Sequence, residues 1–359
     1  MQKKVIAFAN HSLANGGAER VISLLSSHFA EAGYITLLIC NIKADWEYPV
    51  SKNVQRFFLN ENTSKFRPIA AIQRIWRLRQ ICKKERVEVL VGFMSMSEYS
   101  VYATCGIRTK NIISIRNDPD MLYPGHMKKM YTRFLLSKAD GAVFQTEEAK
   151  NWFPNKLQKK STIIFNPIGE SFYQKAHKPV PNLLVATGRL HAQKNYPMLL
   201  SAFAIVRNDI NDAHLEIYGK GYLENELKNL TEKLKLGNSV VFKGQTDDIP
   251  SALSKADVFV LASNFEGMPN SLMEAMAMGI PCVATDSPCG GSRMLIGKSQ
   301  RGILVPVNDK NAFAHAIVTL LKQKDLKNQL SNEAKVFATR FSLKNVAKEW
   351  ESYIFQLIK

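Results

Sequence analysis

Short apolar runs alternate with amphipathic segments along the whole chain, and this alternation is what most limits how the chain can fold. In the first half the runs at 5–10, 34–41 and 87–93 are rich in apolar residues, and the segments 18–32 and 69–84 between them have helical spacing. Strands that alternate with helices in this way form parallel sheets with both faces covered by helices. The sequence therefore predicts an α/β fold.

The alternation restarts after residues 166–182, a segment that contains the Pro, Asn and Gly residues typical of turns and linkers. A chain of 359 residues is also too long for one ordinary core. The strands expected in the second half are 183–188, 213–218, 240–243, 258–262 and 282–285. We predict a first domain over 1–170, a second over 171–340, each around its own parallel sheet, and a final amphipathic segment over 341–359.

Composition fits a globular protein with a basic surface. Apolar residues make up 46% of the chain, and 48 Lys and Arg against 31 Asp and Glu give a net charge of +17. A basic surface attracts nucleic acid, anionic lipid or phosphorylated substrates, but the chain carries no recognised nucleic-acid module. It shows no signal peptide and no apolar run long enough to span a membrane. The five cysteines form no C-x-x-C pair, so we expect free thiols and a cytoplasmic protein.

The first candidate site is the loop around Gly16 and Gly17, which follows the first expected strand and opens a helix. Adjacent glycines let the backbone approach a ligand closely, and the free N–H groups at a helix start bind anions. Residues 15–20 therefore either contact a phosphate or sugar or form a plain strand–helix turn. They lack the G-x-G-x-x-G pattern of dinucleotide-binding folds.

The second candidate is the loop after the strand expected at 183–188, where Gly188 and Arg189 are followed by Lys194 and Asn195. Ligands of open α/β folds bind at the carboxyl edge of the sheet. Arg189 can hold phosphate oxygens bidentately and Lys194 adds a point charge. The two cations could thus neutralise a leaving diphosphate without a metal, and the alternative is a solvated basic loop.

The third candidate is a pair of glutamates, Glu266 and Glu274, around the start of a helix expected at 270–278. Pro269 suits the helix start because its missing N–H costs nothing there, and the free N–H groups near Asn270 form an anion site. Two carboxylates near a diphosphate repel it unless they bind hydroxyls, which sugars and riboses supply. The alternative is a glutamate-rich helix start favoured by the helix dipole.

In their order along the chain these motifs resemble those of retaining GT-B glycosyltransferases of family 4, especially bacterial members that build cell-surface polysaccharides and lipid-linked oligosaccharides. The stretch EGMPNSLMEA resembles the E-x7-E motif of that family, GRL with the following KN its donor-phosphate motif, and GGAER its N-terminal glycine loop. YGKG, FKGQ and NPI also fit, so the resemblance covers nearly the whole chain.

The resemblance implies two Rossmann-like domains facing a central cleft, the first binding the acceptor, the second the nucleotide-sugar donor, with the C-terminal helix crossing back to the first domain. It implies transfer of a hexose or N-acetylhexosamine, with retention of configuration, from a nucleotide-diphosphate sugar that we expect to be UDP-linked. The expected acceptor is a cell-envelope or lipid-linked glycan, such as one on a polyprenyl diphosphate. We expect no metal, no cofactor and no nucleic acid. The alternatives are a nucleotide-sugar epimerase of the same fold and a non-catalytic membrane scaffold.

The resemblance also implies roles for the matching residues. Arg189 and Lys194 would hold the diphosphate and Glu274 the ribose. Glu266 would contact hydroxyls of the transferred sugar. The other donor-binding positions, several of them acting through their backbone, are Gly16, Gly17, Gly188, Gly244, Gln245, Gly267, Met268, Pro269, Asn270, Ser271 and Leu272.

One position departs from the family pattern. Where many relatives have a histidine near the transferred sugar, this chain has Arg116, which we include among the catalytic candidates. Arg116 either binds a phosphate of the acceptor or donor or forms an ion pair with Asp118 or Asp120. The sequence Asp118-Pro119-Asp120 spells the D-x-D metal motif of another glycosyltransferase fold, and we interpret it as a chance loop pattern.

A basic stretch at residues 65–86 combines cationic and large apolar side chains. We favour an amphipathic helix lying on anionic lipid at the inner face of the plasma membrane, where each basic residue contributes about 1 kcal/mol. The alternative is a solvated helix packed on the sheet by its apolar stripe. The basic residues are Lys65, Arg67, Arg74, Arg77, Arg79, Lys83, Lys84 and Arg86.

Overall fold

The computed structural model describes residues 4–14, 16–61, 63–64 and 66–358, and the chain divides into two compact units. Unit 1 consists of Met1–Pro167 together with Leu343–Lys359, and unit 2 consists of Ile168–Ser342. The sequence had placed the boundaries after residues 170 and 340. Unit 1 is therefore built from two separate stretches of the chain.

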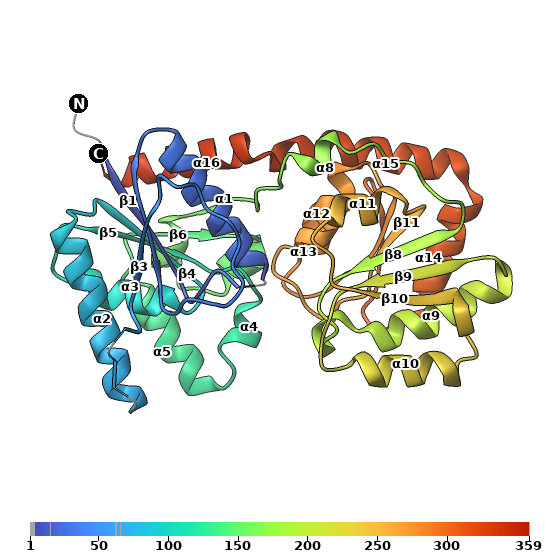
Figure 1. The fold of residues 1–359 in the computed structure, drawn as a ribbon, viewed down its shortest axis with the longest axis horizontal. Helices are drawn as coiled ribbons and strands as arrows, with labels where there is room; N and C mark the ends of the chain where they lie inside the picture. Colours follow the sequence, from blue (N-terminus) through green and yellow to red (C-terminus); the bar gives the residue numbers. More distant parts are fainter. Residues whose placement is uncertain (1–3, 15, 62, 65, 359) are drawn as a thin grey trace. The chain divides into compact units, whose positions relative to one another are not determined.

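Unit 1 contains a seven-stranded parallel sheet with the strand order β3-β2-β1-β4-β5-β6-β7. Helices α1 and α16 lie on one face of this sheet and α2, α3 and α5 on the other (Figure 1). The strands are β1 (Val5–Asn10), β2 (Ile35–Cys40), β3 (Gln55–Phe58), β4 (Val89–Phe93), β5 (Lys110–Ser114), β6 (Gly141–Phe144) and β7 (Ser161–Ile163). The helices are α1 (Gly17–Glu31), α2 (Arg67–Lys84), α3 (Met96–Thr104), α4 (Pro119–Leu122), α5 (His126–Leu136), α6 (Glu147–Asn151), α7 (Asn155–Gln158) and α16 (Leu343–Leu357).

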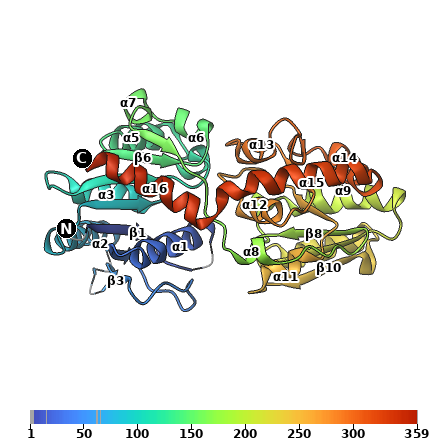
Figure 2. The same ribbon diagram turned by 90° about the horizontal axis from the view of Figure 1, so that it is seen from above.

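Unit 2 contains a six-stranded parallel sheet with the order β10-β9-β8-β11-β12-β13. Helices α9 and α10 lie on one face and α11 and α12 on the other (Figures 1 and 2). The strands are β8 (Leu183–Thr187), β9 (His214–Tyr218), β10 (Val240–Gly244), β11 (Val258–Leu261), β12 (Cys282–Thr285) and β13 (Ile303–Val305). The helices are α8 (Ser171–Gln174), α9 (Tyr196–Asp209), α10 (Glu224–Lys233), α11 (Ile249–Ser254), α12 (Asn270–Ala277), α13 (Gly291–Ile296), α14 (Lys310–Lys322) and α15 (Lys324–Ala338), with short 3₁₀ turns at Ala192–Lys194, Gly237–Ser239 and Thr339–Phe341.

The last helix, α16, is part of unit 1 and packs against α1. Trp350 is fully buried and stacks on Phe93 with ring centroids 5.9 Å apart. The hydroxyl of Tyr353 accepts a hydrogen bond of 2.8 Å from the backbone N–H of Ala142 in β6. The C-terminal segment thus closes the core of unit 1.

Each unit has its own hydrophobic core, because the central strands are buried on both faces and most helices turn their apolar sides inward. The predicted α/β fold with a parallel sheet in each half is confirmed. The elements that the sequence analysis did not predict include β3, β13, α3 and α5. The strands β3 and β13 are too short to show an alternating apolar pattern. Helix α5 exposes several large apolar residues, so its apolar residues do not follow the spacing of a helix packed on a core. Within the described ranges no helix is long and apolar enough to span a bilayer.

Candidate active site

The candidate site lies where the strand order of unit 2 changes direction. Strands β8 and β11 are neighbours in the sheet, while β9 and β10 extend to one side of β8, and β12 and β13 extend to the other side of β11. In open parallel sheets such a switch point leaves a crevice at the carboxyl ends of the two strands, where ligands bind. The loops that follow β8 and β11 contain Arg189, Lys194 and Glu266.

The loop after β8 is shaped by residues that tolerate unusual backbone angles. Gly188 has φ of +151°, and a Cβ there would lie 2.8 Å from Cε of Lys194. Asn195 adopts the left-handed conformation with φ of 48°, which asparagine tolerates. The hydroxyl of Tyr196 donates a hydrogen bond of 3.1 Å to the carbonyl of Gly188, and burial, assisted by the charge of Glu266, raises its pKa so that the proton stays in place. The missing Cβ at Gly188 leaves room for the side chain of Lys194 to lie against it.

An ion pair joins the two loops. Nζ of Lys194 lies 2.7 Å from Oε1 of Glu266, and the two side chains are only 14% and 9% exposed. The hydroxyl of Ser263 donates to the same carboxylate oxygen at 2.8 Å. Glu266 was predicted to bind hydroxyl groups and Lys194 to bind phosphate. Their pairing means that the carboxylate next to the candidate phosphate site is neutralised by a cation.

Gln193 connects Arg189 to this pair, a role that the sequence analysis did not assign. Its Oε1 accepts a hydrogen bond of 3.3 Å from the exposed guanidinium of Arg189, and its Nε2 donates to Oε2 of Glu266 at 3.3 Å. Burial and the charge of Arg189 hold the pKa of His191 below its ordinary value, so the cations of this loop at neutral pH are Arg189 and Lys194. A glutamine that bridges two charged side chains follows no characteristic spacing in the sequence, so this role of Gln193 could not be predicted.

Side-chain amides fasten the same two loops together. Nδ2 of Asn195 donates to Oδ1 of Asn264 at 2.8 Å, and Nδ2 of Asn264 donates to the carbonyl of Ala192 at 2.9 Å. The backbone N–H of Asn264 also donates to the carbonyl of Gln193 at 2.8 Å. The geometry of Lys194 and Glu266 is therefore fixed by several contacts besides the ion pair.

Helix α12 begins directly after Pro269, with Asn270 as its first residue. Glu274 lies one turn into this helix and is 4% exposed, and Leu272 is fully buried. Ser271 Oγ is buried without a hydrogen-bond partner among the described residues.

The segment that leads into α12 packs closely against the start of α13. A Cβ on Gly291 would lie 1.8 Å from the carbonyl oxygen of Gly267, so this contact requires glycine. The backbone N–H of Glu266 also donates to the carbonyl of Pro288 at 2.9 Å. Met268, in the same segment, is buried. The path of the predicted donor-binding segment, residues 267–272, is therefore set by its packing.

Glycines also align the ends of β8, β9 and β10. A Cβ on Gly219 would lie 1.9 Å from the carbonyl oxygen of Gly188. The N–H of Gly219 donates to the carbonyl of Gly244 at 2.8 Å, and Gly244 itself has φ of +71°. Gln245, the next residue, is exposed. Gly188, Gly244 and Gln245 thus lie at the same edge of the sheet as Lys194.

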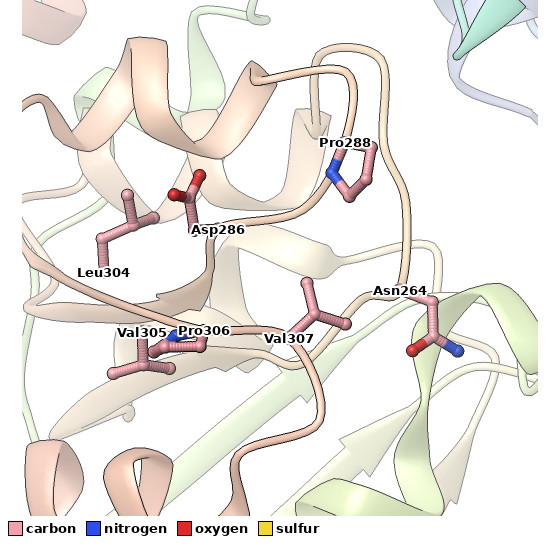
Figure 3. Close-up of a pocket in the computed structure, with 7 residues that line it drawn as sticks. All are labelled: Asn264, Asp286, Pro288, Leu304, Val305, Pro306 and Val307. Carbon is pink, nitrogen blue, oxygen red and sulfur yellow. The ribbon is translucent and has the colours of Figure 1, made fainter. Parts of the chain in front are cut away.

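A pocket of about 600 Å³ opens at the carboxyl ends of β12 and β13 (Figure 3). None of the predicted site residues lines it, but Asn264 does, so it borders the loop of Glu266. Asp286 at its wall forms an ion pair of 2.8 Å with Arg293. The lining residues are Asn264, Asp286, Pro288, Leu304, Val305, Pro306 and Val307.

The predicted site residues of the first domain lie at the carboxyl edge of the sheet of unit 1. Gly16 is the N-cap of α1 and Gly17 is its first residue, whereas Asn15 of the same loop lies outside the described residues. Arg116 follows β5 and is 8% exposed. The ion pair considered between Arg116 and Asp118 or Asp120 is absent from the described part of the chain.

The acidic residues near Arg116 have other partners. Asp118 caps α4 by accepting from the N–H of Asp120, and Asp120 pairs with Lys129 at 2.5 Å. The D-x-D sequence is thus the start of a short helix. Across the described ranges, no group of three or more His, Cys, Asp or Glu residues is arranged to hold a metal ion.

Comparison with known proteins agrees with this fold. Residues 168–337 match the family described as Glycosyl transferases group 1. The chain is 27% identical, over 96% of its length and 97% of the relative, to an N-acetylgalactosamine-N,N'-diacetylbacillosaminyl-diphospho-undecaprenol 4-alpha-N-acetylgalactosaminyltransferase of Campylobacter jejuni. It is 33% identical, over 48% of its length and 45% of the relative, to a UDP-Gal:alpha-D-GlcNAc-diphosphoundecaprenol alpha-1,3-galactosyltransferase of Escherichia coli. The crystal structure of Anabaena HepE in complex with UDP and glucose superposes with a TM-score of 0.84 at 16% identity, covering 98% of this chain and 100% of that one.

Fold and family together define the class of protein: the chain is a glycosyltransferase of the GT-B fold. Its residues 168–337, which make up nearly all of unit 2, match the glycosyl transferases group 1 family. A further relative, 29% identical over 66% of this chain and 35% of that protein, is named as a poly(glycerol-phosphate) alpha-glucosyltransferase of Bacillus subtilis.

Proposed function

We propose that this glycosyltransferase is a retaining enzyme of family 4 that uses a nucleotide-diphosphate sugar, with UDP as the nucleotide. It transfers a hexose or N-acetylhexosamine to a lipid-linked glycan. The observation that carries this proposal is the ion pair between Lys194 and Glu266 at the switch point of unit 2, linked to Arg189 through Gln193. Cations and a hydroxyl-binding carboxylate, fixed at one sheet edge, suit a diphosphate with a sugar attached.

The proposed chemistry follows from these charges. The bond between the sugar C1 and the diphosphate oxygen breaks, and a new bond forms between C1 and the acceptor oxygen on the same face. The diphosphate, which gains negative charge as it leaves, takes up the acceptor proton. Arg189 and Lys194 stabilise that charge, and fixed electrostatic stabilisation of this kind is a large part of catalysis in many enzymes. Glu266 holds hydroxyl groups of the sugar, and Glu274 those of the ribose.

The nature of the acceptor is supported by the relatives. The Campylobacter jejuni and Escherichia coli enzymes are named for acceptors linked to undecaprenol through a diphosphate. We propose that this chain uses an acceptor of the same chemical class. Such a lipid resides in a membrane, so the enzyme should associate peripherally with the cytoplasmic face of the plasma membrane.

The surface of α2 supports this membrane association. The residues of α2 that pack inward are Ala70, Leu78 and Cys82, whereas Ile72 and Trp76 are 67% and 62% exposed. The apolar stripe is therefore only partly used for packing on the sheet. Lys65, the first residue of the basic stretch, lies outside the described residues.

Three of the basic residues of this stretch are held by the protein itself. Arg74, Arg77 and Arg79 donate hydrogen bonds to the Asn60 side chain or to backbone carbonyls. These acceptors are neutral, so the positive charges of the helix are not cancelled by them. The charge therefore remains available to attract anionic lipid.

Helix α5 adds to the same surface. Met127 and Phe134 are 72% and 62% exposed, beside the exposed cations Lys128 and Arg133. Helix α3 packs against both α2 and α5, so the two helices lie on one face of the sheet. Exposed apolar side chains flanked by cations fit the interface of an anionic bilayer. We call this set the α2–α5 surface: Phe66, Ile69, Ile72, Trp76, Met127, Met130, Tyr131 and Phe134.

Vesicle sedimentation tests the membrane contact. The chain should bind vesicles that contain phosphatidylglycerol and should dissociate at high salt. The double variant Trp76→Glu, Phe134→Glu should bind about tenfold more weakly, a change of about 1.4 kcal/mol. The matched control Val180→Glu, Val336→Glu replaces exposed apolar residues of unit 2 and should bind like the parent chain. Equal binding by both double variants would reject the α2–α5 surface.

A transfer assay tests the catalytic proposal. The protein is incubated with a panel of nucleotide sugars, with and without a polyprenyl-diphosphate-linked sugar, and the products are analysed by mass spectrometry and by proton NMR of the anomeric centre. We expect one donor to be consumed only when the acceptor is present, to give an α-linked product from an α-configured donor. Conversion of the donor without acceptor would indicate an epimerase, and failure to bind any donor would indicate a scaffold. A β-linked product would reject retention.

No metal takes part in the proposed reaction, because Arg189 and Lys194 supply the positive charge. The transfer rate should therefore be the same with EDTA as with added Mg²⁺. A rate that falls on chelation and returns with the metal would show that the two cations are insufficient.

A further inference from the structure

Arg116 is a buried cation in unit 1 with a small polar cluster around it. It follows β5 and is 8% exposed. Its neighbours lie at the carboxyl ends of adjacent strands: Phe93 ends β4, Gln145 follows β6 and Asn166 follows β7. Ser114, the last residue of β5, is fully buried, and Gln145 and Asn166 are nearly so. Four neighbouring strands therefore converge on one guanidinium group.

The groups seen in contact with this guanidinium are neutral. It donates to Oγ of Ser114 at 3.2 Å and to Oδ1 of Asn166, and it lies over the ring of Phe93 at 5.4 Å from the centroid. Asn166 Oδ1 is shared, because Nε2 of Gln145 also donates to it at 2.6 Å. No carboxylate among the described residues forms an ion pair with Arg116.

The guanidinium therefore has unused donors. Arginine carries five N–H groups in a planar fork, and the acceptors named above take two of them. Nε of Arg116 is buried and has no hydrogen-bond partner in the described part of the chain. A buried charge without a counter-charge costs folding free energy, and so does a buried donor without an acceptor. Burial lowers the pKa of Arg116 to about 9, so the group still carries its charge at neutral pH.

We propose that Arg116 is the anchor of an anion-binding site in unit 1 that takes a phosphoryl group. The cluster lacks a negative charge and acceptors for the remaining N–H groups. A phosphate supplies the charge, and its oxygens are spaced to accept two hydrogen bonds from the planar guanidinium. The neutral side chains hold the fork in place without cancelling its charge. In the proposed reaction, on which this identification of the ligand rests, the phosphoryl group comes from the lipid diphosphate of the acceptor or from the diphosphate of the donor.

The first test uses inorganic pyrophosphate and the full chain. The background is the variant Arg189→Ala, Lys194→Ala, which removes the candidate phosphate ligands of unit 2. Pyrophosphate should still raise the melting temperature of this background, because a ligand that binds the native state stabilises it. Adding Arg116→Met should weaken pyrophosphate binding at least about tenfold. Replacing Arg116 by Lys, which keeps a charge but loses the fork, should give an intermediate affinity.

A second readout separates binding from a structural role. Without pyrophosphate, Arg116→Met should be as stable as the parent chain or more stable, because it removes an uncompensated buried charge. The Nε–H signal of Arg116 in ¹⁵N-arginine NMR spectra, assigned by its loss in the Met variant, should shift on titration. If pyrophosphate neither stabilises the background nor moves this signal, the site does not exist. A loss of stability in the Met variant together with an unmoved signal would make Arg116 a structural residue.

Kinetics then identify the source of the phosphoryl group. If the acceptor supplies it, Arg116→Lys raises KM for the lipid-linked acceptor about tenfold and leaves the affinity for the donor unchanged. If the donor supplies it, the variant binds the donor more weakly and keeps the KM for the acceptor. The pyrophosphate experiment requires no catalysis, so its result can be read even if the transferase assay fails. An active enzyme that shows no pyrophosphate response would reject the site and leave the proposed function intact.

Discussion

At the scale of single residues, the candidate site depends on one cation and one carboxylate that are close enough to interact directly. Lys194 and Glu266 come from loops far apart in the sequence, and Ser263 and Gln193 complete the hydrogen bonds of the carboxylate. These donors hold the carboxylate in one orientation. The pair thus fixes the positions of the Lys194 ammonium group and the Glu266 carboxylate, and the exposed cation Arg189 lies beside them, linked through Gln193.

Removing the cation should abolish most of the activity. Lys194→Ala should lower kcat/KM by about 100- to 1000-fold, since losing one contact to a charge that develops in the transition state costs about 2.7–4 kcal/mol. Steady-state transfer kinetics measure this change. The control is Lys228→Ala, which breaks an exposed pair with Glu224 on α10 and should leave the kinetics unchanged. Equal rates for the two variants would show that Lys194 has no part in the reaction.

The sequence could indicate the residues of the candidate site but not their contacts. Arg189, Lys194 and Glu266 were recognisable because glycines, cations and glutamates follow expected strands in a familiar order. Gln193 and Asn264 were not, because an uncharged amide that bridges two loops depends on the three-dimensional path of both. The sequence also left open whether Arg116 pairs with a neighbouring aspartate. The capping role of Asp118 and the Asp120–Lys129 pair decide that question.

At the scale of elements, the start of α12 is positioned by a contact between two backbone segments. Gly291→Ala would place a methyl group 1.8 Å from the carbonyl oxygen of Gly267, which only a shift of one segment can relieve. We expect a loss of about 1–3 kcal/mol in unfolding free energy and weaker donor binding. Denaturant titration and donor binding measure the two effects.

The matched control for this variant is Gly169→Ala. A Cβ at Gly169 would meet only Oγ of Ser171 at 3.8 Å, an ordinary contact distance. This variant should keep both the stability and the donor affinity of the parent chain. Unchanged stability and binding in Gly291→Ala as well would mean that the segment before α12 can move freely.

Helix α16 makes a separate prediction about unit 1. Trp350 is fully buried against Phe93, so Trp350→Ala should lower the free energy of unfolding by about 3–5 kcal/mol. Trp76→Ala, which truncates a tryptophan with a 62% exposed side chain, should change it by less than about 0.5 kcal/mol. Denaturant unfolding compares the two. Similar stabilities would show that α16 is not needed to close the core.

The elements differ in how readily the sequence predicts them. Buried strands such as β1, β4 and β8 and the helix α1 have regular apolar patterns, so their positions were predicted closely. Helix α5 was missed because much of its apolar surface faces outward. When the apolar residues of a helix face outward, their spacing does not mark a side that packs on the core, and the sequence then looks like an irregular loop.

At the scale of the whole molecule, each unit repeats one design: a parallel sheet with a switch point in its strand order, and functional candidates at the carboxyl edge. In unit 2 the switch lies between β8 and β11, where the Lys194–Glu266 pair is found. In unit 1 it lies between β1 and β4, and the Gly16–Gly17 loop follows β1. In each unit, therefore, candidate ligand-binding residues follow a strand that lies at the switch point of its sheet.

The central claim is that the loops of unit 2 bind the diphosphate of a nucleotide sugar. Isothermal titration of the full chain with UDP-sugars, repeated with Arg189→Ala, tests this claim most directly, because Arg189 is exposed and its removal should not disturb the fold. We predict that the parent chain binds one nucleotide sugar and that the variant binds it at least about tenfold more weakly. Equal affinity in the two proteins, or no binding of any nucleotide sugar by the parent chain, would contradict the account.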